Sequence, residues 1–130
     1  MKHERGSTMV EASLVTVCFL FLIVGITDFG RLGFAYNSIT YATHLAARFA
    51  ATNGSASGHA ASAATIQSNV TSNLVGLNSA ALTVTVTWTP NNNPGSQVQV
   101  TAAYNFKPLL IPISATTIAL RSRCTETIAQ

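Results

Sequence analysis

The stretch RGSTMVEASLVTVCFLFLIVGITDFGR, residues 5–31, contains the apolar run that decides the fold. No charged side chain occurs from Ala12 to Thr27. A helix that spans a bilayer needs about 20 apolar residues, with about 17 as a lower limit. The apolar neighbours on both sides extend the run to that length. The stretch therefore predicts a transmembrane helix over about residues 10–29.

Composition limits the partners of the 130-residue chain. Only 8% of its residues are charged, the hydrophobic fraction is 48%, and the net charge is +3. An ordinary soluble domain has about a quarter of its residues charged, so this content is low for a free soluble protein. The basic residues are scattered and do not alternate with aromatics, and we therefore expect no nucleic-acid partner.

Motifs of enzymes and metal sites are absent from the sequence. It contains no HExxH, CxxC, GxSxG or P-loop spacing, so we expect no catalytic residues, no metal and no cofactor. Cys18 lies in the apolar run and Cys124 near the other end of the chain. If the run spans a bilayer the two thiols cannot meet, which predicts two packed free thiols rather than a disulfide.

The N-terminus has three interpretations. A secretory signal peptide would be cleaved after residues 33–35, GFA, but Asp28 and Arg31 interrupt its apolar region. An uncleaved signal anchor accounts for the apolar run but not for the carboxylate of Glu11 at its start. The third interpretation is a short leader, MKHERG, at residues 1–6, which resembles a prepilin leader that a membrane peptidase removes after its glycine.

Cleavage between Gly6 and Ser7 would make Glu11 the fifth residue of the mature chain. The free amino group of Ser7 would be positively charged at neutral pH. Because a carboxylate near lipid is costly unless it is paired, we expect Glu11 to dock on the amino terminus of a neighbouring subunit. The plainer alternative is a solvated Glu11 at the headgroup level, stabilised by the helix dipole.

The helix is expected to continue beyond the membrane. No proline or loop signal interrupts residues 7–51, which predicts one helix about 66 Å long at 1.5 Å per residue. Its outer half has two apolar stripes on opposite sides, which favours one contact with its own domain and one with another subunit. A helix buried on both sides within one domain is the alternative. One stripe comprises Phe34, Tyr41, Leu45 and Phe49, and the other comprises Phe29, Leu32, Tyr36, Ile39, Ala47 and Ala50.

Residues 52–130 predict a small globular α+β domain. Alternation of apolar residues with threonine or glutamine predicts a hairpin around the turn PNNNPGS, residues 90–96. A third strand should place Arg121 and Arg123 on the face opposite Cys124. The expected elements are a helix at about 60–75, ending at Gly76, and strands at 82–89, 98–106 and about 116–125. The fold class is therefore α+β, with a long N-terminal pilin-like helix, a short helix and a three-stranded antiparallel sheet.

Residues 6–51 resemble the TadE-like pseudopilins of bacterial tight-adherence (Flp) pilus systems. The segments that carry the resemblance are VEASLV (10–15), TDFGRLGFAYNSIT (27–40) and ATHLAARFAA (42–51). The positions that match the family pattern are Glu11, Asp28, Gly30, Arg31, Ala42, Ala47 and Arg48. The family commonly has Phe-Ala after the glutamate and then a proline, where this chain has Ala12-Ser13 and Val17.

The resemblance implies a pilin-like structural subunit or pseudopilin. It would be held in the inner membrane with its domain outside the cytoplasm, or assembled into an extracellular filament. Its partners would be other pilin or pseudopilin subunits, a prepilin peptidase and the inner-membrane assembly machinery. A single-pass adapter that does not polymerise is the alternative. Asp28 and Arg31 are expected to pair on one helix face, with a hypothetical role in releasing or registering the subunit, and Arg48 is expected to make a contact within the fold.

Overall fold

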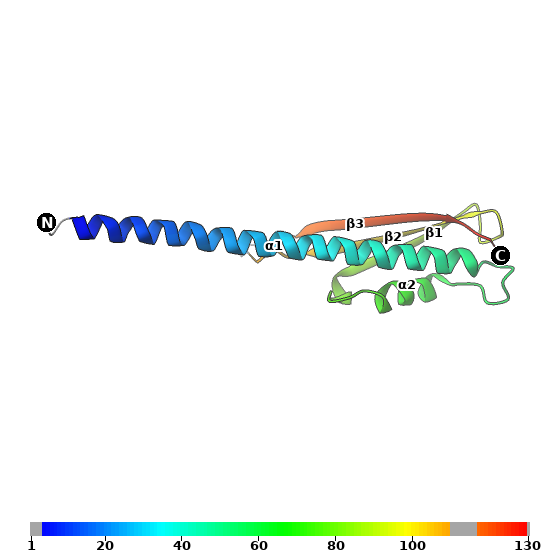
Figure 1. Ribbon diagram of the computed structural model, residues 1–130. Helices are drawn as coiled ribbons and strands as arrows, with labels where there is room; N and C mark the ends of the chain where they lie inside the picture. Colours follow the sequence, from blue (N-terminus) through cyan, green and yellow to red (C-terminus); the bar gives the residue numbers. More distant parts are fainter. Residues whose placement is uncertain (1–3, 110–116, 130) are drawn as a thin grey trace.

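The computed structural model describes residues 4–109 and 117–129 and confirms the predicted α+β class. Figure 1 shows the first half of α1 projecting alone, while its second half lies along the sheet and beside α2. The elements are α1 (Glu4–Thr52), α2 (Ala63–Ser72), the 3-10 helix η1 (Ser79–Ala81), β1 (Leu82–Thr89), β2 (Gln97–Phe106) and β3 (Ile118–Thr127).

The projecting half of α1 is long and apolar enough to span a membrane. Its most apolar window has a mean hydropathy of 2.4, and no residue of that window is buried by the rest of the chain. Three hydroxyl groups in this half, those of Ser13, Thr16 and Thr27, donate to helix carbonyls three or four residues earlier. These bonds satisfy polar groups that lipid cannot solvate.

The sheet has the order β1-β2-β3, and both strand pairs are antiparallel. The predicted hairpin is confirmed, with Val86 opposite Val100. Because side chains alternate across a strand, β2 turns its apolar residues toward α1 and buries them. Arg121 and Arg123 of β3 are exposed, whereas Cys124 is buried, as the alternation predicted.

The buried face of α1 differs from the predicted stripes. Ile39 and Ala47 are buried as expected for one stripe, but Phe29 and Tyr36 of that stripe are 76% and 49% exposed. The contact combines part of that stripe with small residues beside it, such as Ala42 and Ala46, which let the helix approach the sheet and α2 closely. The fully or almost fully buried residues of α1 are Ala35, Ile39, Ala42, Thr43, Ala46, Ala47 and Ala50. The other stripe is exposed at Phe34 and Tyr41 and half-buried at Leu45 and Phe49.

Two element ends also differ from the predictions. α2 ends at Ser72 rather than at residue 75, because the amide side chain of Asn73 donates to the Asn69 carbonyl at 2.8 Å and caps the helix. β3 ends at Thr127 rather than at residue 125, because it pairs with β2 along the whole length of that strand. The predicted start of β3, at residue 116, lies outside the described residues.

Candidate functional site

The N-terminal turns of α1 carry the predicted processing and docking residues. Gly6 and Ser7 lie inside the helix, which begins at Glu4; residues 1–3 of the predicted leader lie outside the described part of the chain. A Cβ atom added at Gly6 would meet no other atom within 4 Å. Gly6, Ser7 and Glu11 line one shallow groove of the helix surface, together with Val10 and Leu14.

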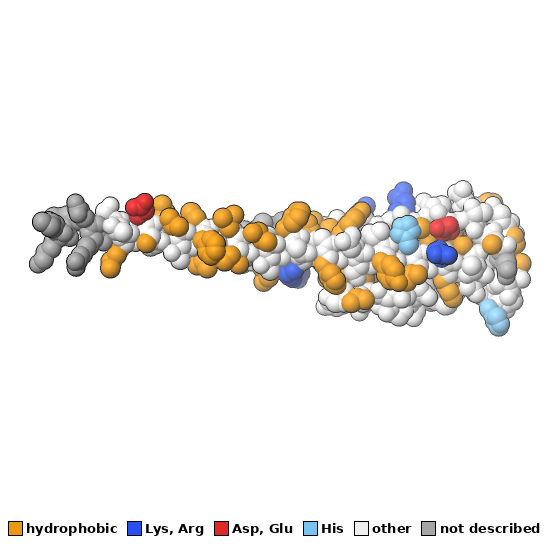
Figure 2. Space-filling model, in the orientation of Figure 1, with side chains coloured by type: hydrophobic (Ala, Val, Ile, Leu, Met, Phe, Trp, Pro, Cys, Tyr) orange, Lys and Arg blue, Asp and Glu red, His pale blue; other side chains and the backbone are white. Residues whose placement is uncertain are grey.

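Glu11 is exposed on the projecting half of α1. Figure 2 shows hydrophobic side chains along the visible face of this half. Between Gly6 and Asp28 the sequence contains no other charge. Within residues 4–109 and 117–129, Glu11 forms no ion pair. Its carboxylate is therefore available to a positive group supplied from outside the folded part of this chain.

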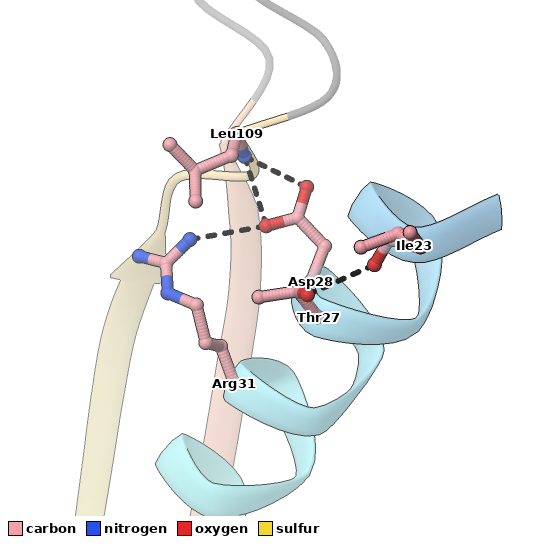
Figure 3. A network of polar contacts seen from close by, with 5 residues as sticks. All are labelled: Ile23, Thr27, Asp28, Arg31 and Leu109. Atoms are coloured by element: carbon pink, nitrogen blue, oxygen red, sulfur yellow. Dashed lines mark hydrogen bonds and ion pairs between the residues drawn. The ribbon is translucent and has the colours of Figure 1, made fainter. Parts of the chain in front are cut away.

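Asp28 forms a link between α1 and the end of β2 (Figure 3). Its carboxylate accepts the Leu109 N–H through both oxygens, at 2.8 and 3.0 Å. The same carboxylate pairs with Arg31 Nη1 at 3.0 Å, so the structure brings together the two residues that the spacing paired. Asp28 is only 12% exposed and Arg31 is 46% exposed. The aspartate therefore does more than form a surface ion pair, because it fixes the chain after β2 to the helix.

Arg31 also contacts the sheet. Its guanidinium carbon lies 5.4 Å from the centre of the Phe106 ring, within the range of a cation–π interaction. Only one of its nitrogens faces Asp28 in Figure 3, and the others face away. The guanidinium is thus held in place by Asp28 and Phe106 while most of its N–H donors remain available.

The other family-motif residues have different environments. Gly30 is exposed, and a Cβ atom there would meet nothing within 4 Å. Ala47 is fully buried in the core. Arg48 is exposed and forms no ion pair among the residues that the structure describes. Ala47 is therefore a packing residue, whereas nothing within the described fold accounts for Arg48.

A thiol–imidazole contact joins α1 to β3, and sequence reasoning missed it. Cys124 Sγ lies 3.1 Å from His44 Nδ1 and 3.9 Å from a carboxylate oxygen of Glu126. Burial raises the pKa of the Cys124 thiol above its ordinary value, and the nearby Glu126 charge raises it further. Both cysteines of the chain are free thiols, with Cys18 exposed on the projecting helix. The raised pKa keeps Cys124 as a neutral thiol, which suits packing better than nucleophilic chemistry.

The contact between Cys124 and His44 could not be found from sequence patterns. Alternation along the strand places Cys124 on the inner face, but only the packing of α1 on β3 decides that His44 lies opposite. The Asp28–Leu109 bond is similar, because it joins residues 81 positions apart. No motif spacing contains information about either pair.

Comparison with known families gives one match. The sequence profile of the family described as TadE-like protein matches residues 6–48. This match covers most of α1 and none of the sheet. Comparisons with curated proteins and with solved structures find no match. The TadE-like family is a structural family whose members are associated with tight-adherence pili. Residues 6–48 are therefore similar to the TadE-like family, as the resemblance predicted, whereas the match does not extend to the rest of the chain.

Proposed function

We propose that this chain is a pilin-like subunit or pseudopilin of a tight-adherence pilus. A prepilin peptidase cleaves it after Gly6, and the mature helix anchors it in the inner membrane with the folded domain outside the cytoplasm. Neighbouring subunits then assemble through their N-terminal helices. The observation that carries the proposal is the position of Glu11 in a stretch of α1, residues 7–27, that has no other charge and is not buried by the described part of the chain.

The exposed apolar surface of α1 supports a membrane or a filament core as its surroundings. Val10, Leu14, Phe19 and Ile26 are between 60% and 71% exposed, and they belong to a continuous apolar surface. Soluble monomers rarely expose such a surface over more than a few hundred Å². Lipid covers it before assembly, and the helices of neighbouring subunits cover it afterwards.

The spacing of Ser7 and Glu11 supports docking between subunits. After cleavage, the amino group of Ser7 lies one helical turn, or about 6 Å along the axis, before Glu11. A neighbour displaced along the axis by about one turn brings its own amino group level with this carboxylate. Because both charges lie near lipid, pairing them offsets a desolvation cost that each would carry alone.

The mature N-terminus tests the processing step. Mass spectrometry of membrane fractions and of sheared surface fractions should find a chain that begins at Ser7. A chain that begins at Tyr36 would identify a secretory signal peptide, and a chain that keeps Met1 would identify an uncleaved anchor. Either result would overturn the proposal.

A glycine variant separates peptidase recognition from folding. Gly6→Leu should block cleavage without disturbing the fold, because a Cβ atom at this position meets none of the other described residues within 4 Å. Gly25→Leu is the matched control, since Gly25 also lies on the exposed helix with open space around it. Normal processing of Gly6→Leu would contradict cleavage at this site.

A charge variant tests docking. Glu11→Gln should be cleaved normally yet be lost from the sheared fraction, because the amide cannot pair with an amino terminus as a charge does. Glu11→Gln present in that fraction at the wild-type level would refute docking by Glu11. A wild-type chain that is cleaved but stays in the membrane fraction would identify an adapter that does not polymerise.

A further inference from the structure

A cavity of about 630 Å³ lies between α1, the loop after α2 and the end of β2. The helix wall consists of Thr27, Gly30, Arg31 and Phe34, which are three or four residues apart and so share one face. The opposite wall is held in place by Ser38 of α1, whose hydroxyl group bonds both the N–H and the carbonyl of Val75. The cavity is thus part of the fold and has the size of a small-molecule site.

The cavity lies beside the end of the apolar run. Arg31 is four residues, or about 6 Å, beyond Thr27, the last residue of that run. The bond between Asp28 and Leu109 holds the end of β2 at the same level. Each headgroup layer of a bilayer is about 5–8 Å thick. If the apolar run spans the hydrocarbon, the cavity opens within the headgroup layer next to the folded domain.

Two positive charges line this cavity. Arg31 uses one nitrogen for Asp28, and its remaining donors face away from that carboxylate (Figure 3). Lys107 is exposed, and within the described residues it has no carboxylate partner. Asn78 and Asn105 also belong to the lining of this cavity. One of the two cations is therefore not neutralised.

We propose that this cavity binds the headgroup of an anionic phospholipid, with phosphatidylglycerol as the matching chemistry. Arg31 and Lys107 hold the phosphate through charge-assisted hydrogen bonds. The acyl chains follow the exposed side of α1 past Ile23, which lies one turn below Thr27 on the same face.

This inference rests on the membrane part of the proposed function and on no other part of it. Cleavage after Gly6 and assembly into a filament are not required. Carbonate extraction of membranes reports whether the chain is integrated, independently of lipid retention. The two proposals can therefore fail separately.

Lipid retention tests the cavity in the full chain. The protein is reconstituted with phosphatidylcholine alone or with added phosphatidylglycerol, returned to mild detergent, and examined by native mass spectrometry. The wild type should retain phosphatidylglycerol in preference to phosphatidylcholine. Lys107→Gln should lower this retention about tenfold, the factor that corresponds to ~1.4 kcal/mol.

A second variant blocks the cavity and leaves every charge in place. Gly30→Leu places a side chain in the cavity beside Arg31, where a Cβ atom meets none of the other described residues within 4 Å. Gly33→Leu is the matched control, because Gly33 is also open but does not line the cavity. Arg123→Gln, on the outer face of the sheet, controls for loss of one positive charge. Both controls should retain the lipid as the wild type does.

Several results would overturn the inference. Equal retention of the two lipids, or wild-type retention by both Lys107→Gln and Gly30→Leu, would show that the cavity does not hold the headgroup. Displacement of the lipid by inorganic phosphate alone would identify a site for the free anion. Extraction of the chain by carbonate would overturn this inference together with the membrane part of the proposed function, whereas an integrated chain without bound lipid would refute only the headgroup site.

Discussion

Replacing Asp28 by alanine should release the end of β2 from α1. The carboxylate accepts the Leu109 N–H at 2.8 and 3.0 Å, and the Asp28 side chain is only 12% exposed. A hydrogen bond to a charged group contributes about 1.5–3 kcal/mol. The ion pair adds about 0.3–0.5 kcal/mol, because Arg31 is 46% exposed and solvent screens it. We therefore expect Asp28→Ala to lower the free energy that holds Leu109 against α1 by about 2–3 kcal/mol. Most of this loss comes from the hydrogen bond to the Leu109 N–H.

Amide hydrogen exchange at Leu109 in the full chain measures this loss directly. A loss of about 2–3 kcal/mol corresponds to a fall in protection of about 30- to 150-fold. Asp28→Asn keeps one carbonyl acceptor but loses the charge, so its effect should be smaller. Arg31→Gln removes only the ion pair and the contact with Phe106, which together contribute about 1 kcal/mol. Arg123→Gln, on the far face of the sheet, should leave the amide unchanged.

The relative loss of Leu109 amide protection in these variants tests the role of Asp28. A larger effect of Arg31→Gln than of Asp28→Ala would mean that the cation, and not the backbone bond, holds the end of β2. Full protection of Leu109 in Asp28→Ala would mean that other contacts hold this segment. In either case the assignment of Asp28 as the link between α1 and β2 would be wrong.

Three further predictions concern the stability of the folded domain, measured by tryptophan fluorescence during unfolding. Ser62→Ala removes the N-cap of α2 and should lower the free energy of unfolding by about 1 kcal/mol, while Ser62→Thr should lower it less. Equal losses for the two variants would contradict the capping role. Gly76→Ala should lower the free energy of unfolding by about 1–2 kcal/mol, because the φ angle of Gly76 is +69° and the new Cβ would lie 3.3 Å from the Phe34 ring. A stabilising substitution would contradict that geometry. The native pKa of Cys124 is raised, so its contribution to stability is fully present below the ordinary thiol pKa and is lost as pH rises through the native pKa. The stability difference between wild type and Cys124→Ala should therefore decrease at alkaline pH, and a constant difference would contradict the burial of the neutral thiol.

The processing and docking residues could be proposed from sequence because their signal is a spacing. Gly6 and Glu11 are five positions apart at the start of an uncharged run, and Asp28 and Arg31 are three apart on a helix. These relations need no knowledge of the tertiary structure. The role of Leu109 could not be proposed in this way, since a backbone N–H leaves no mark in the sequence.

The burial of α1 shows a second limit of sequence reasoning. Large apolar residues suggested the buried face, but Phe34 and Tyr41 are exposed and the contact is formed by residues such as Ala42 and Ala46. Close approach of two backbones favours small side chains, whereas the aromatics remain at the margins or outside. Hydrophobic size therefore indicated an apolar helix correctly but the buried face only in part, since Ile39 and Ala47 of one predicted stripe are buried whereas its aromatic residues are exposed.

The sequence by itself determined the elements of this protein: one uninterrupted helix with an apolar first half, and strands marked by alternating residues. Both signals are local, because helix and strand periodicities are set by backbone geometry over a few residues. Only the tertiary structure decided which face of α1 packs on the sheet, that Asp28 binds the chain after β2, and that His44 meets Cys124. These contacts join residues about 80 positions apart, and they depend on how closely whole surfaces fit together, which no local pattern records.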